Sequence, residues 1–152
     1  MAARLEDRTV GIGDGIDLHY VEAGEGRPLI IIPSWSLTGA AYRRQLEVLS
    51  RTRRVMAFDM RGHGDSTTPE GGYRVSRLAA DLRAVIERLE LDRVDLMGHS
   101  IGSSIIWSYI DRFGEDRLGR LVFVDQAPSV TAKADWSTNT RRPRRSSPKR
   151  SM

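Results

Sequence analysis

The chain of 152 residues contains no cysteine, so it can form neither disulfide bonds nor a thiolate metal site. The absence of cysteine fits a reducing compartment. We expect no metal and no cofactor. The chain also lacks any apolar run near the ~20 residues that a membrane span needs. Its N-terminus, MAARLEDRTV, has no apolar core of signal-peptide length. We therefore expect a cytoplasmic protein without a membrane partner.

Excess positive charge is missing from most of the chain, although the net charge is +4. Residues 129–152 hold seven of the 24 basic residues and one of the 20 acidic ones, which leaves 17 basic and 19 acidic residues in 1–128. Residues 1–128 therefore give no basis for a nucleic-acid-binding surface. The segment RRPRRSSPKR keeps binding to nucleic acid or to an acidic surface open as a separate hypothesis.

Apolar side chains are nearly absent from the end of the sequence. The last twelve residues contain only Arg, Pro, Ser, Lys and the terminal Met. Such a composition cannot bury a core, so we expect 129–152 to be a basic, disordered tail. From the length of the chain, we expect one structured domain, formed by residues 1–128.

Within 1–128 the apolar periodicity alternates between strand and helix. Two short strands are expected around the Gly-Asp-Gly turn, and buried strands at 29–33, 54–59, 93–98 and 120–125. Helices are expected at about 40–49, 75–89 and 101–113. This alternation predicts an α/β fold with a mostly parallel sheet and flanking helices, whose chemistry gathers at the carboxyl ends of the strands.

One of those strand ends carries a G-x-S-x-G motif, Gly98-His99-Ser100-Ile101-Gly102. In a strand–turn–helix setting this pattern is typical of a nucleophile elbow. The serine of such a turn adopts a strained backbone conformation, so the residues two before and two after it must lack bulk. The alternative is that the glycines only make a tight turn and that Ser100 caps the following helix.

Four segments in order resemble the first half of an α/β-hydrolase: IIIPSWSLTGAAY, FDMRGHGDSTTP, GHSIGSS and LVFVDQAP. The resemblance covers roughly 15–128 and implies Ser100 as the nucleophile. A serine rather than an aspartate there points to esterases, lactonases, cofactor-free haloperoxidase-like enzymes or C–C hydrolases, and away from epoxide hydrolases and dehalogenases. The implied partner is a small-molecule acyl substrate.

The resemblance also implies two backbone N–H donors for an oxyanion hole, those of Trp35 and Ile101. Trp35 falls where the family has the residue after His-Gly, and Pro33-Ser34 replaces that pair here. The alternative for Trp35 is a rim aromatic that covers apolar surface. A donor of this kind contributes about 3 kcal/mol to transition-state stabilisation.

The catalytic base is the partner that the sequence lacks. The family order is Ser, then acid, then His, and no histidine follows Ser100. We interpret His19 as a surface residue, His63 as a packing residue, and His99 as a side chain that points away from Ser100. Asp125 is a candidate for the triad acid, with capping of the next loop or orienting Gln126 as alternatives.

The sequence therefore predicts a serine hydrolase that is truncated and impaired, with an incomplete α/β-hydrolase fold lacking its lid and last strands. Asp59 is expected to anchor the loop around Arg61. The segment RLVFVD would be left as an apolar sheet edge, so we expect self-association through that edge. The competing hypothesis is a non-catalytic α/β module that binds or interacts without chemistry.

Overall fold

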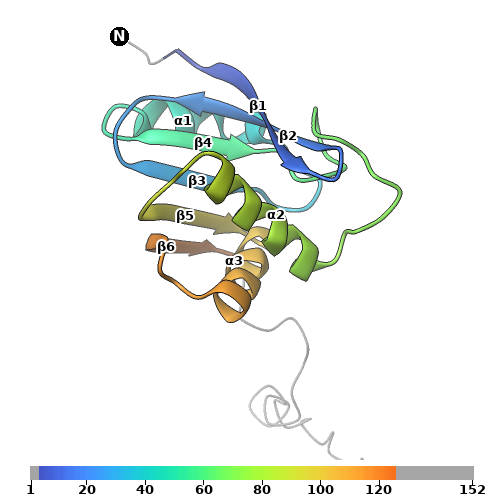
Figure 1. Cartoon of the computed structure of the whole chain (residues 1–152). Helices are drawn as coiled ribbons and strands as arrows, with labels where there is room; N and C mark the ends of the chain where they lie inside the picture. The colour runs from blue at the N-terminus through green and yellow to red at the C-terminus, as the bar shows by residue number, and fades with distance from the viewer. Residues whose placement is uncertain (1–3, 126–152) are drawn as a thin grey trace, which may run out of the picture.

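The computed structural model describes residues 4–125 (Figure 1). Its strands are β1 (Glu6–Gly13), β2 (Ile16–Ala23), β3 (Pro28–Ile32), β4 (Arg54–Phe58), β5 (Val94–His99) and β6 (Leu118–Val124). Its helices are the 3₁₀ turn η1 (Gly39–Tyr42) and the α-helices α1 (Arg43–Leu49), α2 (Val75–Arg88) and α3 (Ile101–Phe113). Every predicted element is present, and the expected helix from Ala40 begins as the 3₁₀ turn.

The six strands form one sheet in the order β1-β2-β4-β3-β5-β6. β1 pairs with β2 and β2 with β4 in antiparallel fashion, whereas β4, β3, β5 and β6 run parallel to one another. Parallel strands have to be joined by crossovers, which η1 with α1, α2 and α3 supply. The sheet is mostly parallel and matches part of an α/β-hydrolase fold, as the sequence predicted.

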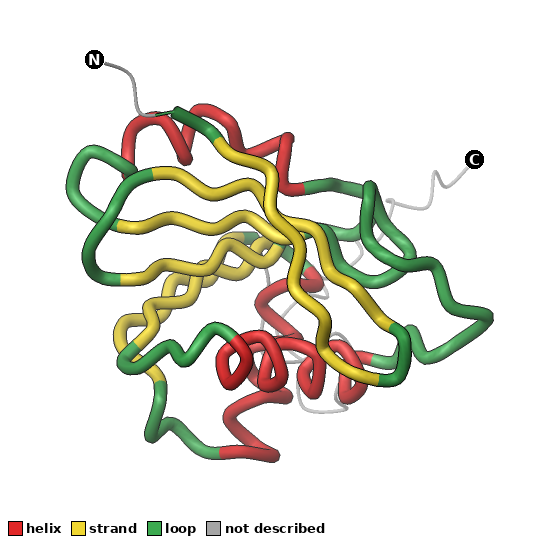
Figure 2. Tube along the Cα trace, turned by 45° about the horizontal axis from the view of Figure 1, so that its top comes forward, coloured by secondary structure: helices red, strands yellow, loops and turns green. Residues whose placement is uncertain are grey.

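The helices cover both faces of the sheet (Figure 2). α2 and α3 pack on one face, where Ile30, Leu96 and Ile106 belong to the larger apolar core. η1 and α1 pack on the other face against a smaller core around Ile31, Leu46 and Val55. Adjacent residues of β3 therefore point into different cores, which explains why LIII reads as a continuous apolar run.

The last strand differs from the expectation. RLVFVD was predicted to be a buried strand, but β6 contains no buried residue and Val122 is 49% exposed. The reason is its position, because β6 is an edge strand with a neighbour on one side alone in the described part of the chain, as the expected apolar sheet edge required.

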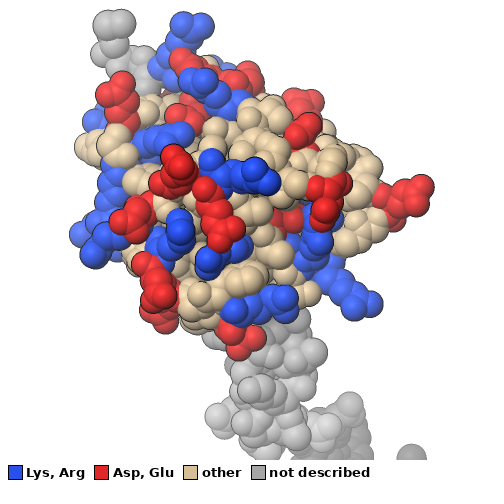
Figure 3. Space-filling view, viewed as in Figure 1, with Lys and Arg blue, Asp and Glu red and all other residues tan. Residues whose placement is uncertain are grey.

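The surface of the described residues carries mixed charge. Acidic and basic side chains are interspersed over the face in Figure 3. None of the helices within 4–125 is long and apolar enough to cross a bilayer. The boundary at residue 128 and the predicted disordered tail lie outside the described residues.

Candidate active site

Ser100 lies in the turn between β5 and α3, at the carboxyl end of a central strand. Its backbone has φ 52° and ψ −116°, a strained conformation for a residue with a side chain. The Ser100 N–H donates a hydrogen bond of 2.8 Å to the carbonyl of Val124, so the end of β6 holds the turn in place. The strain and this contact together present a half-buried serine at the start of a helix.

The two glycines of the motif are required by contacts with backbone. A Cβ on Gly98 would lie 2.6 Å from the carbonyl carbon of Gly102 and from the nitrogen of Ser103. A Cβ on Gly102 would lie 2.3 Å from the carbonyl oxygen of Ile32. The turn is therefore packed against the end of β3 so closely that neither position has room for a side chain.

The helix-cap alternative for Ser100 is wrong in this structure. Ser100 occupies the N-cap position of α3, but its side chain makes no capping hydrogen bond. The adjacent Ser103 hydroxyl instead donates to the carbonyl of Gly98 at 2.7 Å and is fully buried. Ser103 fixes the turn, while the Ser100 hydroxyl has no hydrogen-bond partner among residues 4–125.

The two predicted oxyanion donors lie on segments that touch each other. Trp35 belongs to the loop after β3, and Ile101 is the first residue of α3. The backbone of Gly102 packs directly on the carbonyls of Ile32 and Pro33, which brings the loop against the start of the helix. Within 4–125 neither N–H makes a hydrogen bond, so both remain able to donate. The positive end of the α3 dipole adds to the preference for negative charge there.

A tyrosine that the sequence did not single out joins this loop to the motif. The Tyr42 hydroxyl accepts the Ser34 N–H at 3.2 Å and lies 2.9 Å from Nδ1 of His99. The Tyr42 hydroxyl is therefore held by partners from the loop after β3 and from the end of β5. Burial raises the pKa of Tyr42, although the hydrogen bond from Ser34 lowers it. Tyr42 thus fixes the residue that precedes Trp35.

None of the three histidine rings forms a hydrogen bond with Ser100. His99 points to Tyr42, as just described. His63 bonds through Nδ1 to the Arg61 carbonyl at 3.0 Å, and its ring meets the exposed Trp35 edge-on, with centroids 4.9 Å apart. The structure therefore shows His63 and His99 in packing and hydrogen-bonding contacts rather than beside the candidate nucleophile.

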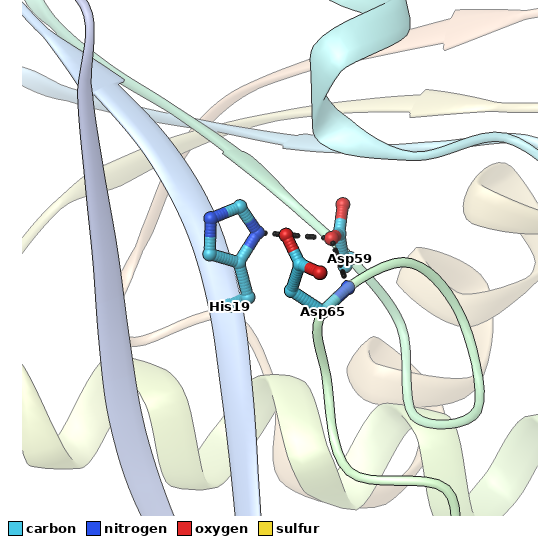
Figure 4. Close-up of side chains that lie close together, drawn as sticks. All are labelled: His19, Asp59 and Asp65. Atoms are coloured by element: carbon cyan, nitrogen blue, oxygen red, sulfur yellow. Dashed lines mark hydrogen bonds and ion pairs between the residues drawn. The ribbon is translucent and has the colours of Figure 1, made fainter.

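The expectation for His19 was wrong, because its side chain is only 12% exposed. Its Nδ1 lies 2.9 Å from Asp59 and its Nε2 lies 3.0 Å from Asp7 (Figure 4 shows the Asp59 side). Carboxylates accept hydrogen bonds, so both contacts favour the doubly protonated, cationic form of His19. Burial lowers the pKa of His19, but the hydrogen bonds to Asp59 and Asp7 outweigh it and the pKa is raised.

Asp59, at the end of β4, anchors the following loop, as expected. Its carboxylate accepts the N–H of Gly39 at 2.6 Å and that of Asp65 at 3.0 Å, besides the proton of His19. His19, Asp59 and Asp65 also place potential metal-binding atoms within 4.8 Å of one another (Figure 4). The Asp59 oxygens already accept hydrogen bonds, and both His19 nitrogens already face carboxylates. We therefore interpret the three residues as a structural hydrogen-bonded cluster rather than as a metal site.

Arg61 lies in the loop that Asp59 anchors, and its side chain pairs with Asp81 of α2. The guanidinium donates two hydrogen bonds of 2.6 Å to the two carboxylate oxygens, and both side chains are buried. The pair ties the loop after β4 to the helix that follows it. Because the pair is buried, removing Asp81 leaves the charge of Arg61 uncompensated in the core, whereas Asp81 without Arg61 would keep its 3.5 Å ion pair with Arg77.

Asp125, the candidate acid, lies directly after β6, one residue beyond the carbonyl that binds Ser100. It is exposed and has a positive φ of 55°. Its carboxylate forms no hydrogen bond or ion pair with the described residues. Asp125 therefore lies next to the serine turn. Its alternative role was to orient Gln126, which lies outside the described residues.

Comparison with known proteins gives the same family throughout. The family described as the alpha/beta hydrolase fold matches residues 27–151. A non-heme chloroperoxidase of Kitasatospora aureofaciens is 37% identical over 80% of this chain and 45% of its own length. A soluble epoxide hydrolase of Corynebacterium is 32% identical over 80% of this chain and 42% of its own.

A solved structure agrees with these sequence matches. The bromoperoxidase of Bacillus anthracis superposes with a TM-score of 0.73 at 33% identity, covering 78% of this chain and 44% of that protein. The chain thus spans less than half the length of these relatives. From the sheet order, the strained serine turn and these matches, the chain belongs to the α/β-hydrolase family.

Proposed function

We propose that this chain is a serine hydrolase of the α/β-hydrolase family that acts on an ester or similar small acyl substrate. The observation that carries the proposal is the strained turn, which presents a half-buried Ser100 hydroxyl at the N-terminus of α3 without a capping role. A serine that only shaped the turn would not need φ 52°. Nor would it need glycine at two positions where any side chain would collide with backbone.

In the proposed reaction the Ser100 Oγ attacks the acyl carbon while a base takes its proton. The carbonyl oxygen becomes an oxyanion that accepts the N–H groups of Trp35 and Ile101. Collapse of this intermediate expels the alcohol and leaves an acyl group on Ser100, which water then removes. Asp125 is the candidate that would orient the base.

The base is the part that these residues do not supply. None of the three histidine rings forms a hydrogen bond with Ser100, and no histidine follows Ser100 in the 152 residues. We assign the base to sequence that these residues do not contain, so that the chain by itself is an impaired enzyme. Loss of the base costs several orders of magnitude in rate and leaves the contribution of binding and the oxyanion hole.

The proposal is tested by acetylation of the protein with p-nitrophenyl acetate, with and without added imidazole. Imidazole can replace a missing base in solution, so it should speed release of p-nitrophenol from the wild-type chain more than from Ser100→Ala. The rate with imidazole alone, without protein, is subtracted. Equal rates for wild type and Ser100→Ala would favour the alternative, a non-catalytic α/β binding or interaction module.

A further inference from the structure

His99 occupies the variable position of the G-x-S-x-G motif, directly before Ser100. It is the last residue of β5, and the residue before it, Gly98, pairs with Ile32 at the end of β3. The sheet therefore fixes the point from which the His99 side chain starts, beside the candidate nucleophile. A side chain that is anchored in this way can serve as a fixed point for a neighbouring segment of the site.

The His99 ring is connected through one tyrosine to residues 33–38, which we call the oxyanion loop. Its Nδ1 lies 2.9 Å from the Tyr42 hydroxyl, and the two rings meet edge-on with centroids 6.2 Å apart. The same hydroxyl accepts the N–H of Ser34 at 3.2 Å. Tyr42 is buried in the smaller apolar core, so its ring has little room to move. Two consecutive hydrogen bonds thus join His99 to the backbone of Ser34.

Ser34 is the first residue of the turn that carries Trp35. The Leu37 N–H donates to the Ser34 carbonyl at 3.1 Å, and Ser36 has a positive φ of 66°. This is the hydrogen bond of a four-residue β-turn, in which Trp35 and Ser36 are the central residues. The position of Ser34 therefore sets the position of the Trp35 N–H, the proposed oxyanion donor.

The other end of the oxyanion loop, where η1 begins, is held by separate contacts. The Gly39 N–H donates to the buried Asp59 carboxylate at 2.6 Å, and a Cβ on Gly39 would lie 2.2 Å from the carbonyl oxygen of Ala57. This close packing against β4 gives residue 39 little freedom. Near the start of the loop the N–H of Ser34 has Tyr42 as its one acceptor among residues 4–125. The Tyr42 hydroxyl is therefore the constraint on that end of the loop.

The protonation state of His99 decides whether the two hydrogen bonds of Tyr42 are compatible. A phenol hydroxyl has one proton to donate, and in Tyr42 its oxygen already accepts the N–H of Ser34. If the His99 ring is neutral with its proton on Nε2, then Nδ1 accepts the Tyr42 proton and both contacts are satisfied. If Nδ1 carried a proton, two donors would face the same oxygen, and the Tyr42 proton would have no acceptor among the described residues. The arrangement therefore favours a neutral His99 that accepts through Nδ1.

We propose that His99 is a positioning residue, which holds the oxyanion loop through the Tyr42 hydroxyl and so places the Trp35 N–H relative to Ser100. The inference rests on the proposed function, because that function makes Trp35 an oxyanion donor. The acceptor at Nδ1 is what the role requires of residue 99. The alternative is that His99 only fills space beside Tyr42, which a phenyl ring would do equally well.

Three substitutions at position 99 separate the hydrogen bond from the packing. His99→Phe keeps a ring of similar shape without an acceptor. His99→Asn can place its amide oxygen where Nδ1 lies, whereas His99→Gln carries the same amide a methylene farther, close to the position of Nε2. His99→Asn should therefore keep the contact with Tyr42, and His99→Phe and His99→Gln should lose it. Circular dichroism shows that each variant is folded, and His99→Gln tests the same point if His99→Phe unfolds.

The first measurement is the release of p-nitrophenol from p-nitrophenyl acetate with imidazole, with the rate of Ser100→Ala subtracted. Displacement of a reacting group by about 1 Å can cost about a hundredfold in rate, so His99→Phe and His99→Gln should react about ten- to a hundredfold more slowly than wild type. The loss should lie in the limiting rate rather than in KM, because the Trp35 N–H acts on the transition state. His99→Asn should recover most of the rate.

The second measurement is hydrogen exchange of the Ser34 N–H by NMR, which depends on no reaction. Exchange should be about fivefold faster in His99→Phe than in wild type or His99→Asn, as expected for the loss of one hydrogen bond. Tyr42→Phe removes the acceptor itself and gives the upper limit of the rate.

The two measurements separate failure of this proposal from failure of the proposed function. If wild type reacts faster than Ser100→Ala but His99→Phe matches wild type in both measurements, His99 holds nothing and the proposal is overturned. The same holds if His99→Asn behaves like His99→Phe, because the ring and not its acceptor would then matter. If wild type reacts no faster than Ser100→Ala, the proposed function fails, and hydrogen exchange alone decides whether His99 holds the loop.

Discussion

Replacing Gly102 by alanine distinguishes the close packing of the elbow from the behaviour of an ordinary helix. Gly102 is the second residue of α3, and helix propensity alone predicts that alanine stabilises by about 1 kcal/mol. The added Cβ, however, would lie 2.3 Å from the Ile32 carbonyl oxygen and 3.1 Å from that of Pro33. Relief to an ordinary contact requires a shift of about 1 Å, and such overpacking costs about 1–3 kcal/mol. The collision outweighs the propensity, so we expect a net loss of stability.

The same shift should affect the chemistry. It separates the loop carrying Trp35 from the start of α3, and a displacement of about 1 Å can cost about a hundredfold in rate. Urea unfolding measures the stability, and modification of Ser100 by a fluorophosphonate measures the reactivity. Gly71→Ala is the control, since a Cβ there meets no atom within 4 Å. If Gly102→Ala is as stable as wild type and reacts as fast, the argument from close packing is refuted.

Three further predictions concern the side chains that hold the site's loops. Asp81→Leu leaves the buried Arg61 unpaired and should cost about 3–5 kcal/mol in urea unfolding, whereas the double variant Arg61→Met/Asp81→Leu should recover most of it; equal losses would contradict a buried charge penalty. The pKa of His19 is raised above 6.5 in the folded chain. The free energy of unfolding that protonated His19 contributes is therefore complete below pH 6.5 and is lost as the pH rises through the folded pKa. Wild type should therefore lose stability toward alkaline pH relative to His19→Gln, and parallel pH profiles would argue against the cation. Tyr42→Phe removes the acceptor of the Ser34 N–H, so it should cost about 1 kcal/mol and slow modification of Ser100; an unchanged modification rate would show that Tyr42 does not position the loop.

The sequence predicted the elements well because the buried strands and amphipathic helices have clear periods. The run 29–33 lies at the centre of the sheet, where both faces are covered, and α3 begins at the residue after the serine turn as the motif required. The run RLVFVD was interpreted as a buried strand from its apolar residues, although the expected loss of the later strands already implied a sheet edge, and its residues are half-buried or exposed there. The burial of β6 was therefore predicted wrongly.

The side-chain network around the site was less accessible from sequence. His19 was interpreted as a surface residue because it alternates with buried side chains in β2, yet Asp59, 40 residues later, lies against it. Likewise, Tyr42 and His99 are 57 residues apart in sequence and reach hydrogen-bonding distance only in the folded chain. Contacts of this kind depend on sheet order and register, which local patterns do not specify. The G-x-S-x-G motif was recognisable because its constraints are local.

Ser100 is the reactive nucleophile of the proposed reaction, and the site of fluorophosphonate modification tests this most directly. Peptide mass spectrometry of the folded chain treated with the probe and imidazole should find the adduct on Ser100 ahead of every other serine. Unfolding in urea should abolish that preference, because the strained turn and the free N–H groups are lost. No adduct on Ser100, or equal modification of folded and unfolded chain, would contradict the account.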